Sequence, residues 1–199
     1  MTSTVQVVAT ELYRARITPQ GSLPRFKLGS TTVHATVVQI VTYIGYSQIG
    51  FVCVFVLTNL TKNCLGRLRP HFIDVCKPVN ITCRGNEYYE NYVCSGNPVL
   101  VSEARKSFFS GHSAFSMYAS TFAAVYLLAR IPRHTFGRAA LPVIQTTVIA
   151  IGLLISFSRI NDNKHHWSDV IVGILVGMFI AVYTVSYIFS ILKIFQFLR

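Results

Sequence analysis

The chain has 199 residues, of which 52% are hydrophobic and only 13% are charged. Soluble domains usually carry about 25% charged residues, so this composition argues against a water-soluble domain and indicates that a bilayer covers much of the surface. The net charge of +11 does not indicate nucleic acid, because the basic residues stand between long apolar stretches. A membrane face or an anionic lipid headgroup is the simpler partner.

Four apolar stretches follow one another along the chain, at about residues 32–58, 112–131, 141–158 and 170–191. A helix needs about 20 mostly apolar residues to cross a bilayer, so each stretch is a candidate span. Residues 1–10 lack the basic start and the apolar core of a signal peptide and resemble the end of a hydrophobic segment. We therefore predict an all-α fold, a multi-span transmembrane helix bundle forming one domain over residues 1–199, with a long extracytosolic loop at 59–111.

The orientation follows from where the basic residues stand. If all four stretches cross, residues 1–31, 130–140 and 192–199 share one side, and residues 59–113 and 158–169 share the other. Each side has nine Lys and Arg residues, but those of the first side are concentrated in short flanks, where the positive-inside bias acts. We expect the second side to be extracytosolic, and the triplet that begins at Asn80 is a glycosylation acceptor there.

Three cysteines, Cys76, Cys83 and Cys94, share the long loop. Their spacing matches no zinc pattern. A disulfide between two of them, in an oxidising compartment, and three free thiols both remain open.

Three polar clusters stand at the ends of the apolar stretches, all on the same expected side. In chain order they are Lys62 to Pro70, Ser110 to His112 and Ser158 to Asp169. Taken singly, Lys62, Arg67 and Arg69 also fit interfacial anchors, and Ser110 fits a helix cap. Their joint occurrence on one side of a helix bundle favours a shared site.

The first part of that site fits a phosphate group. Lys62, Arg69 and Arg159 are cations that can neutralise phosphate, and arginine can do so with paired hydrogen bonds. The Ser110 hydroxyl is a donor, and the Gly111 amide lies at an expected helix start, where anions bind.

The second part fits phosphoryl transfer by two histidines. One histidine can attack phosphorus while the other protonates the leaving oxygen. Asp169 follows His165 by four residues, so a helix that begins there places both on one face. A carboxylate on one ring nitrogen fixes the tautomer and leaves the other nitrogen free to attack.

With these patterns the sequence resembles the type 2 phosphatidic acid phosphatase superfamily, and within it the animal lipid phosphate phosphatases. The family signature is Lys-x6-Arg-Pro, Pro-Ser-Gly-His and Ser-Arg-x5-His-x3-Asp. The first and third parts are met in full, while Phe109 replaces the proline of the second, as an aromatic residue does in the animal branch. The resemblance covers roughly residues 35–190. Because the family has six spans, it implies that the first is absent here and that the second survives, at most, as residues 1–10.

The resemblance also implies roles for the site residues. Lys62, Arg69, Ser110, Gly111 and Arg159 would bind phosphate. His165 would form a phosphohistidine, and Asp169 would orient it. His112 would protonate the lipid alcohol and then activate water. No cofactor and no metal is implied. The substrates would be phosphatidate, lysophosphatidate, ceramide phosphate and sphingosine phosphate, hydrolysed on the extracellular or lumenal face of the plasma membrane or an internal membrane.

Three alternatives remain. The chain could be a catalytically weak or inactive short member of the family that acts through partners, or it could hydrolyse a different phosphate ester, such as a sugar phosphate. A transporter or channel fits less well, because the ionisable residues stand at span ends and not at mid-membrane. The sequence also leaves a homo-oligomer open.

Overall fold

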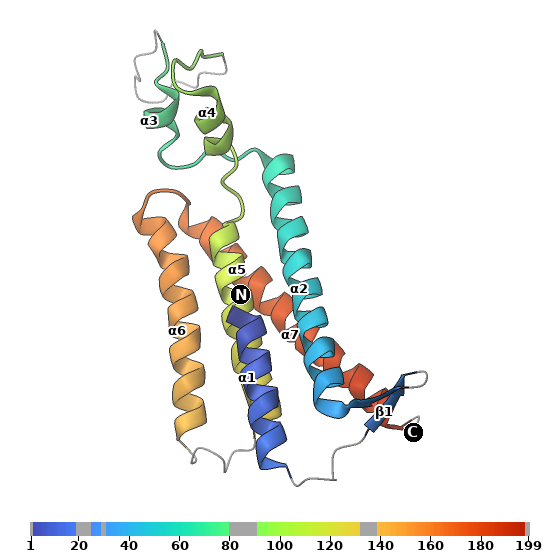
Figure 1. The fold of residues 1–199 in the computed structure, drawn as a ribbon. Coiled ribbons are helices and arrows are strands. Elements are labelled where there is room, and N and C mark those ends of the chain that lie inside the picture. The colour runs from blue at the N-terminus through green and yellow to red at the C-terminus, as the bar shows by residue number, and fades with distance from the viewer. Residues whose placement is uncertain (1, 19–24, 29–30, 80–90, 132–138, 198–199) are drawn as a thin grey trace.

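The computed structural model describes residues 2–18, 25–28, 31–79, 91–131 and 139–197, and its dominant feature is a bundle of helices (Figure 1). The all-α expectation is confirmed, with one addition, an antiparallel hairpin that pairs Arg25 with His34. In chain order the elements are α1 (Thr2–Ile17), β1 (Arg25–Leu28), β2 (Thr31–His34), α2 (Ala35–Leu65), α3 (Phe72–Cys76), α4 (Pro98–Ala104), α5 (Gly111–Arg130), α6 (Ala140–Asn161) and α7 (Trp167–Phe197).

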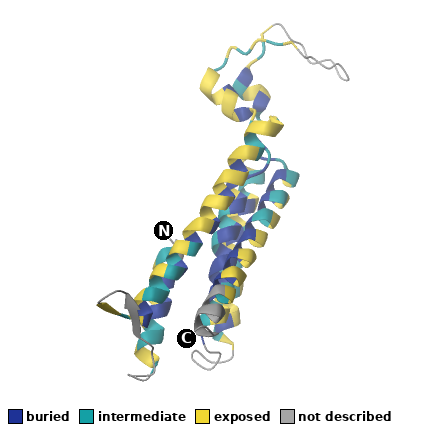
Figure 2. Cartoon of the chain, turned by 90° about the vertical axis from the view of Figure 1, so that its right-hand side faces the viewer, coloured by how far each residue is buried: buried dark blue, intermediate teal, exposed yellow. Residues whose placement is uncertain are grey.

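Helix α5 is the centre of the bundle. It contacts α1, α2, α6 and α7, and buried residues occur along its whole length. Its rings Tyr118, Phe122 and Tyr126 stack in sequence, and Tyr43 of α2 meets Tyr126 edge to face. The outer faces of the surrounding helices are exposed, as Figure 2 shows in yellow, and many of the exposed residues are large and apolar. This distribution suits a bundle whose outer surface faces lipid.

Three of the described helices are long and apolar enough to cross a membrane: α2, α6 and α7 over Trp167–Ser190. The helix expected at 112–131 is present as α5, but it is not among these three. The neighbouring helices, and not lipid, cover α5, so it carries small and polar buried residues such as Ser113, Ser120 and Thr121. A crossing by α5 stays a prediction.

Helix α2 continues past the expected end of the first span at residue 58, to Leu65, and Lys62 lies in its last turn. Hydropathy falls where a helix leaves the bilayer, but polar residues do not end a helix. Gly66 ends it, with the left-handed φ of 55° that favours glycine at a helix C-terminus. The expected start at residue 32 is also displaced, since Thr31–His34 is a strand and the His34 ring caps the helix.

The other boundaries differ in the same way. Helix α6 runs three residues past the expected 158, to Asn161, and α7 begins at Trp167 and not at residue 170. The expected loop at 59–111 contains two short helices, α3 and α4, which lie above the bundle in Figure 1.

Two glycines allow α7 to lie close against α5. A Cβ atom on Gly177 would stand 2.3 Å from the Ala114 carbonyl oxygen, and one on Gly173 would stand 2.6 Å from the Ser110 carbonyl oxygen. Both neighbours are main-chain atoms, so neither position accepts a side chain without moving a helix. The pair sets the depth at which α7 meets the first turn of α5.

Hydrogen bonds and an ion pair hold helix α1 against the bundle at the end opposite α3 and α4. The Glu11 carboxylate, 1% exposed, receives two hydrogen bonds from Arg130, of 2.7 and 2.6 Å, and one of 2.6 Å from the Tyr126 hydroxyl. The Arg130 guanidinium also lies over the Tyr43 ring, 4.8 Å from its centre. Arg130, which begins the basic flank at residues 130–140, is therefore also a partner of a buried carboxylate.

Candidate active site

The three polar clusters converge at one end of the bundle, where α2 ends, α5 begins and α6 turns into α7 (Figure 1). Main-chain hydrogen bonds connect these segments. Arg69 N donates to Ala104 O at 2.8 Å, Ser107 N to Arg67 O at 2.9 Å, and Ser110 N to Asp169 O at 3.0 Å. The last bond joins the second cluster directly to the third.

Two histidines outside the expected site add further connections. The His71 ring lies 2.8 Å from the Asn163 carbonyl oxygen, and the His166 ring lies 3.1 Å from the Leu68 carbonyl oxygen. Both contacts join the segment after α2 to the turn between α6 and α7. The positions of the first and third clusters therefore depend on each other.

The first turn of α5 has the features of an anion site. Ser110 is its N-cap, and its hydroxyl oxygen accepts from Ser113 Oγ at 2.9 Å, which leaves its own hydrogen free to donate. A Cβ atom on Gly111 would stand 3.6 Å from Lys62 Nζ and 3.1 Å from Thr58. The ammonium group of Lys62 thus lies beside the bare backbone at a helix N-terminus, where an anion gains from both.

The two arginines of the site differ in how far they are already paired. Arg69 is 3.9 Å from Glu103, and its Nε is buried without a hydrogen-bond partner among the described residues. Arg159 is paired with Asp162 at 2.9 Å. Arg69 is the better prepared of the two to receive an anion, and Arg159 would first have to share or leave Asp162.

His112 lies in the first turn of α5 and is exposed. The charges of Arg159, Lys62 and Arg69 act on its ring. The structure therefore brings the expected acid of the second cluster into the field of the cations from the first and third clusters. An exposed ring surrounded by cations can meet an anionic substrate from solvent.

His165 is 4% exposed, in the turn before α7, and Asp169 is 0% exposed. Burial first, and then the charges of Arg69 and Lys62, lower the pKa of His165 from 6.5 to about 4. The ring is therefore neutral near pH 7, the state in which a histidine nitrogen can be a nucleophile.

The expected contact between Asp169 and His165 is longer than a hydrogen bond. Asp169 Oδ2 lies 3.9 Å from His165 Nδ1. The Ser107 hydroxyl lies beside the pair and contacts both groups, 2.6 Å from Asp169 Oδ2 and 3.4 Å from His165 Nδ1. Four-residue spacing placed the two groups on one side of the turn, but it could not show that a third side chain contacts both of them.

Sequence reasoning missed both Ser107 and Arg67 as parts of this site. Arg67 donates to Ser168 at 2.9 Å and forms an ion pair with Asp169. Arg67 stands inside the first cluster, two residues before Arg69, and Ser107 stands three residues before Ser110, outside the second cluster. Their proximity to the motifs was the available signal in the sequence, but neither residue is a fixed position of the family signature.

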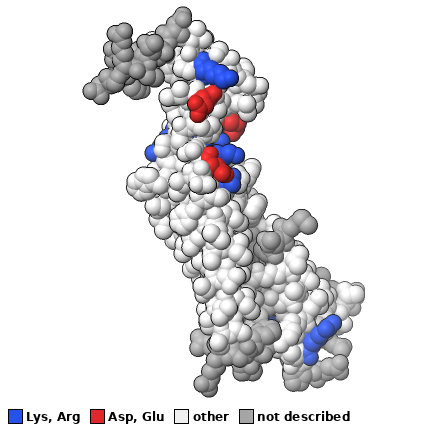
Figure 3. All heavy atoms as spheres, turned by 90° about the vertical axis from the view of Figure 1, so that its left-hand side faces the viewer, with Lys and Arg blue, Asp and Glu red and all other residues white. Residues whose placement is uncertain are grey.

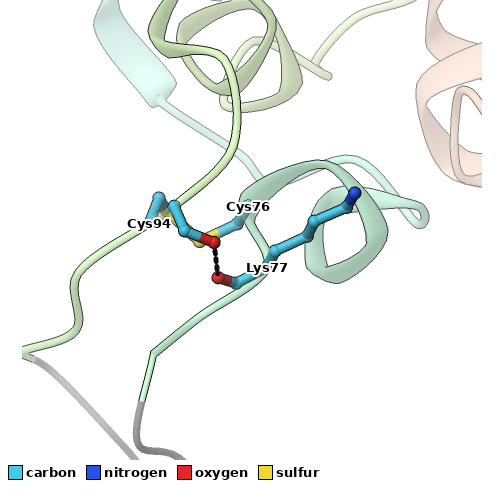
Figure 4. Close-up of a disulfide and its surroundings, with 4 residues drawn as sticks. Cys76, Lys77 and Cys94 are labelled. Carbon is cyan, nitrogen blue, oxygen red and sulfur yellow. Dashed lines mark hydrogen bonds between the residues drawn. A yellow bond between two sulfur atoms is a disulfide. The ribbon is translucent and has the colours of Figure 1, made fainter.

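The described residues between α2 and α5 form a small capping unit above the site. The Cys76–Cys94 disulfide closes it, beside a 2.8 Å hydrogen bond from Ser95 to the Lys77 carbonyl oxygen (Figure 4). The Arg105 guanidinium lies 5.4 Å from the centre of the Phe72 ring and 5.5 Å from that of Tyr92. Of the two alternatives for the loop cysteines, the structure has the disulfide, while Cys83 and the glycosylation candidate Asn80 lie outside the described residues.

Charged side chains gather at this end of the molecule. On the face in Figure 3, the described Lys, Arg, Asp and Glu residues crowd the upper part, and the long middle of the face is white. Within the described ranges, no three His, Cys, Asp or Glu side chains are grouped as metal ligands. The expectation that the reaction needs no metal stays a prediction.

Comparison with known proteins agrees with the family suggested by the motifs. The PAP2 superfamily model matches residues 36–192. The chain is 49% identical over 185 residues to the phospholipid phosphatase homolog 1.2 homolog of Caenorhabditis elegans, an alignment that covers 91% of this chain and 54% of that protein.

Two mammalian relatives are similar over a shorter length. Identity over 139 residues is 44% to phospholipid phosphatase 1 of Rattus norvegicus and 45% to phospholipid phosphatase 2 of Homo sapiens, covering 69% of this chain and 49% and 48% of theirs. The chain spans about half the length of the curated relatives it matches. No solved structure is significantly similar to it. Because the family match includes every expected site residue from Lys62 to Asp169, the chain belongs to the PAP2 superfamily, in the branch of the animal lipid phosphate phosphatases.

Proposed function

We propose that this chain is an integral-membrane lipid phosphate phosphatase that hydrolyses phosphate monoesters of lipids through a phosphohistidine. The observation that carries the proposal is the convergence of three cations and two histidines, one of them buried and neutral, at one end of an apolar helix bundle. Lys62, Arg69 and Arg159 supply positive charge where a phosphate would lie. A lipid substrate suits a site that opens beside lipid-facing helices.

In the first step His165 Nε2 attacks phosphorus, and the bond from phosphorus to the lipid oxygen breaks. His112 gives a proton to that oxygen, so the lipid leaves as a neutral alcohol. In the second step His112 accepts a proton from water as the water oxygen attacks the phosphohistidine. The bond from phosphorus to Nε2 breaks, inorganic phosphate leaves, and both histidines return to their starting states.

The phosphate oxygens would be held by the other site residues. Lys62 and Arg69 lie on the α2 side, Arg159 on the α6 side, and the Ser110 hydroxyl and Gly111 amide at the start of α5. Charge that develops in the transition state would be stabilised by these preorganised donors. The substrates we propose are phosphatidate, lysophosphatidate, sphingosine phosphate and ceramide phosphate.

We propose that the site faces the extracellular space or the lumen of an internal membrane. The Cys76–Cys94 disulfide in the capping unit supports this side, because disulfides persist in oxidising compartments. The basic residues at the other end, Arg14 and Arg16 of α1, support the opposite, cytosolic assignment for that end.

The test is phosphate release from phosphatidate in detergent micelles with excess chelator, for the wild-type chain and for His165→Ala. We expect chelator-resistant release from the wild type and none from the variant, with both proteins inserted and folded. Retained hydrolysis in a well-expressed His165→Ala protein would overturn the mechanism. No release from either folded protein would favour the alternative of a non-catalytic family member that acts through partners.

A further inference from the structure

In the proposed function, on which this inference rests, Asp169 orients the nucleophile His165. Each oxygen of Asp169 has a hydrogen-bond partner: Arg67 on Oδ1, and both Ser107 and the His166 amide on Oδ2. The His165 ring is not within hydrogen-bond distance of either oxygen, since Nδ1 is 3.9 Å from the nearer one. The carboxylate therefore does not hold the ring directly.

The Ser107 hydroxyl is placed to connect them. Its distance of 2.6 Å to Asp169 Oδ2 means that the hydroxyl donates its hydrogen to the carboxylate, which can only accept. Its oxygen lone pairs then face His165 Nδ1 at 3.4 Å and can accept from an N–H there. With the proton on Nδ1, the other ring nitrogen, Nε2, keeps a free lone pair.

Ser107 is also held in place by its main chain. It is 0% exposed, and its amide donates to the Arg67 carbonyl oxygen at 2.9 Å. Arg67 is itself the ion-pair partner of Asp169. The main chain of the serine is thus held by the same residue that forms the ion pair with the carboxylate.

We propose that Ser107 is a positioning residue of the reaction: its hydroxyl accepts from His165 Nδ1 and donates to Asp169, so that the carboxylate orients the nucleophile through the serine. The arrangement sets the tautomer of His165 without direct contact between acid and ring. It assigns a role to a residue outside the three fixed motifs.

The first test separates orientation from binding. The Ser107 hydroxyl contacts His165 and Asp169 and is not one of the proposed phosphate donors, so Ser107→Ala is expected to lower kcat by about 10–100-fold and to leave KM unchanged. The matched control is Ser156→Ala, which removes an equally buried hydroxyl away from His165 that bonds to Gly152 O of α6 at 2.8 Å and to Ser116 Oγ of α5 at 3.2 Å. A Ser107→Ala enzyme with the kcat of Ser156→Ala would show that the hydroxyl is dispensable.

The second test asks whether Asp169 acts through Ser107. In a double-mutant cycle, Ser107→Ala is expected to lower kcat little further in an Asp169→Asn background, because Asp169→Asn already interrupts the hydrogen bonds that connect the carboxylate to the ring. Full additivity of the two losses would overturn the proposal. If Ser107→Ala fails to fold, Ser107→Cys replaces it in both tests, because the thiol is close in size but only a weak donor.

The third measurement does not depend on activity. Nitrogen-15 histidine spectra of the detergent-solubilised chain, with the His165 signals assigned from their loss in His165→Gln, report which ring nitrogen is protonated. We expect Nδ1 protonation in the wild type and in Ser156→Ala, and a mixture of tautomers in Ser107→Ala. If the wild-type chain releases no phosphate but its tautomer still differs from that of Ser107→Ala, the proposed phosphatase function is refuted, while Ser107 still sets the tautomer of His165. An unchanged tautomer in Ser107→Ala would refute that role, whatever the activity.

Discussion

Arg67, which directly follows the Gly66 cap of α2, forms an ion pair with the carboxylate of Asp169 in the first turn of α7. The side chain of Asp169 is 0% exposed and that of Arg67 is 40% exposed, so the arginine shields the carboxylate from solvent on one side. The contact joins residues 102 positions apart in the chain. It connects the first motif segment to the third without using a fixed residue of the first motif.

Replacing Arg67 should therefore destabilise the site. Arg67→Ala leaves a buried negative charge with fewer partners, and we expect a loss of about 1–3 kcal/mol in the free energy of unfolding, moderated because water can reach the position. Arg67→Lys should lose less, since it keeps the charge. The measurement is thermal unfolding in detergent, with Lys77→Ala, at an exposed residue of the capping unit, as control. An Arg67→Ala protein as stable as this control would contradict the expectation.

The pH dependence of kcat/KM should reflect the environment of His165. Because burial, Arg69 and Lys62 lower the pKa of His165 to about 4, the ring stays neutral as pH falls through 6.5, and its protonation should reduce kcat/KM only near pH 4. Lys62→Gln removes one of these cations, so the acid limb should move to higher pH.

The control for the pH profile is Lys77→Gln, which lies in the capping unit and is exposed. The second ionisation of the substrate phosphate also affects the profile, but it is the same for every variant and cancels in the comparison. If Lys62→Gln and Lys77→Gln have the same acid limb, Lys62 does not act on the nucleophile.

The disulfide of the capping unit should affect both stability and substrate binding. Cys76 and Cys94 are 18 residues apart, and closing a loop of this length contributes about 3 kcal/mol in the chain-entropy model. The Ala104 carbonyl of the same unit accepts from the Arg69 amide, so a loosened cap should displace Arg69 and raise KM more than it lowers kcat. Cys94→Ser tests this, and Cys64→Ser, at an exposed free thiol, is the control. Equal KM values in the two variants would show that the cap does not position Arg69.

The contact between α5 and α7 should depend on Gly177. A Cβ atom there would meet the Ala114 carbonyl oxygen at 2.3 Å, so Gly177→Ala must move one helix, and we expect a loss of about 1–3 kcal/mol. Gly45→Ala in α2 is the matched control, because nothing lies within 4 Å of its Cβ position. There the same change should be neutral or stabilising by about 0.5–1 kcal/mol. Similar melting temperatures for the two variants would mean that α5 and α7 are less closely packed than described.

Much of the fold could be predicted from local properties of the chain. The apolar stretches predicted the helices α2, α5, α6 and α7, and the motif residues stand at the helix ends that meet. The helix ends themselves were less predictable. The extension of α2 through Lys62 to Leu65 depends on Gly66, because a helix continues into water until a residue such as glycine stops it.

The role of α5 shows where hydropathy stops being informative. Its buried Ser113, Ser120 and Thr121 would mark a poor candidate span if lipid surrounded it, but α1, α2, α6 and α7 do. Helix α1 is a similar case, because its Glu11 is buried only through the bonds from Arg130 and Tyr126. Which residues a helix may carry depends on what covers it.

The sequence by itself determined the class of fold, the family and the residue types that gather at the site, because apolar length and motif spacing are properties of the chain alone. Only the tertiary structure decided that the Ser107 hydroxyl contacts both His165 and Asp169 and that Arg67 neutralises the carboxylate. These contacts join residues 58 to 102 positions apart. Their distances depend on how closely α5 and α7 pack, and that closeness is a property of two surfaces in contact, which no single segment contains.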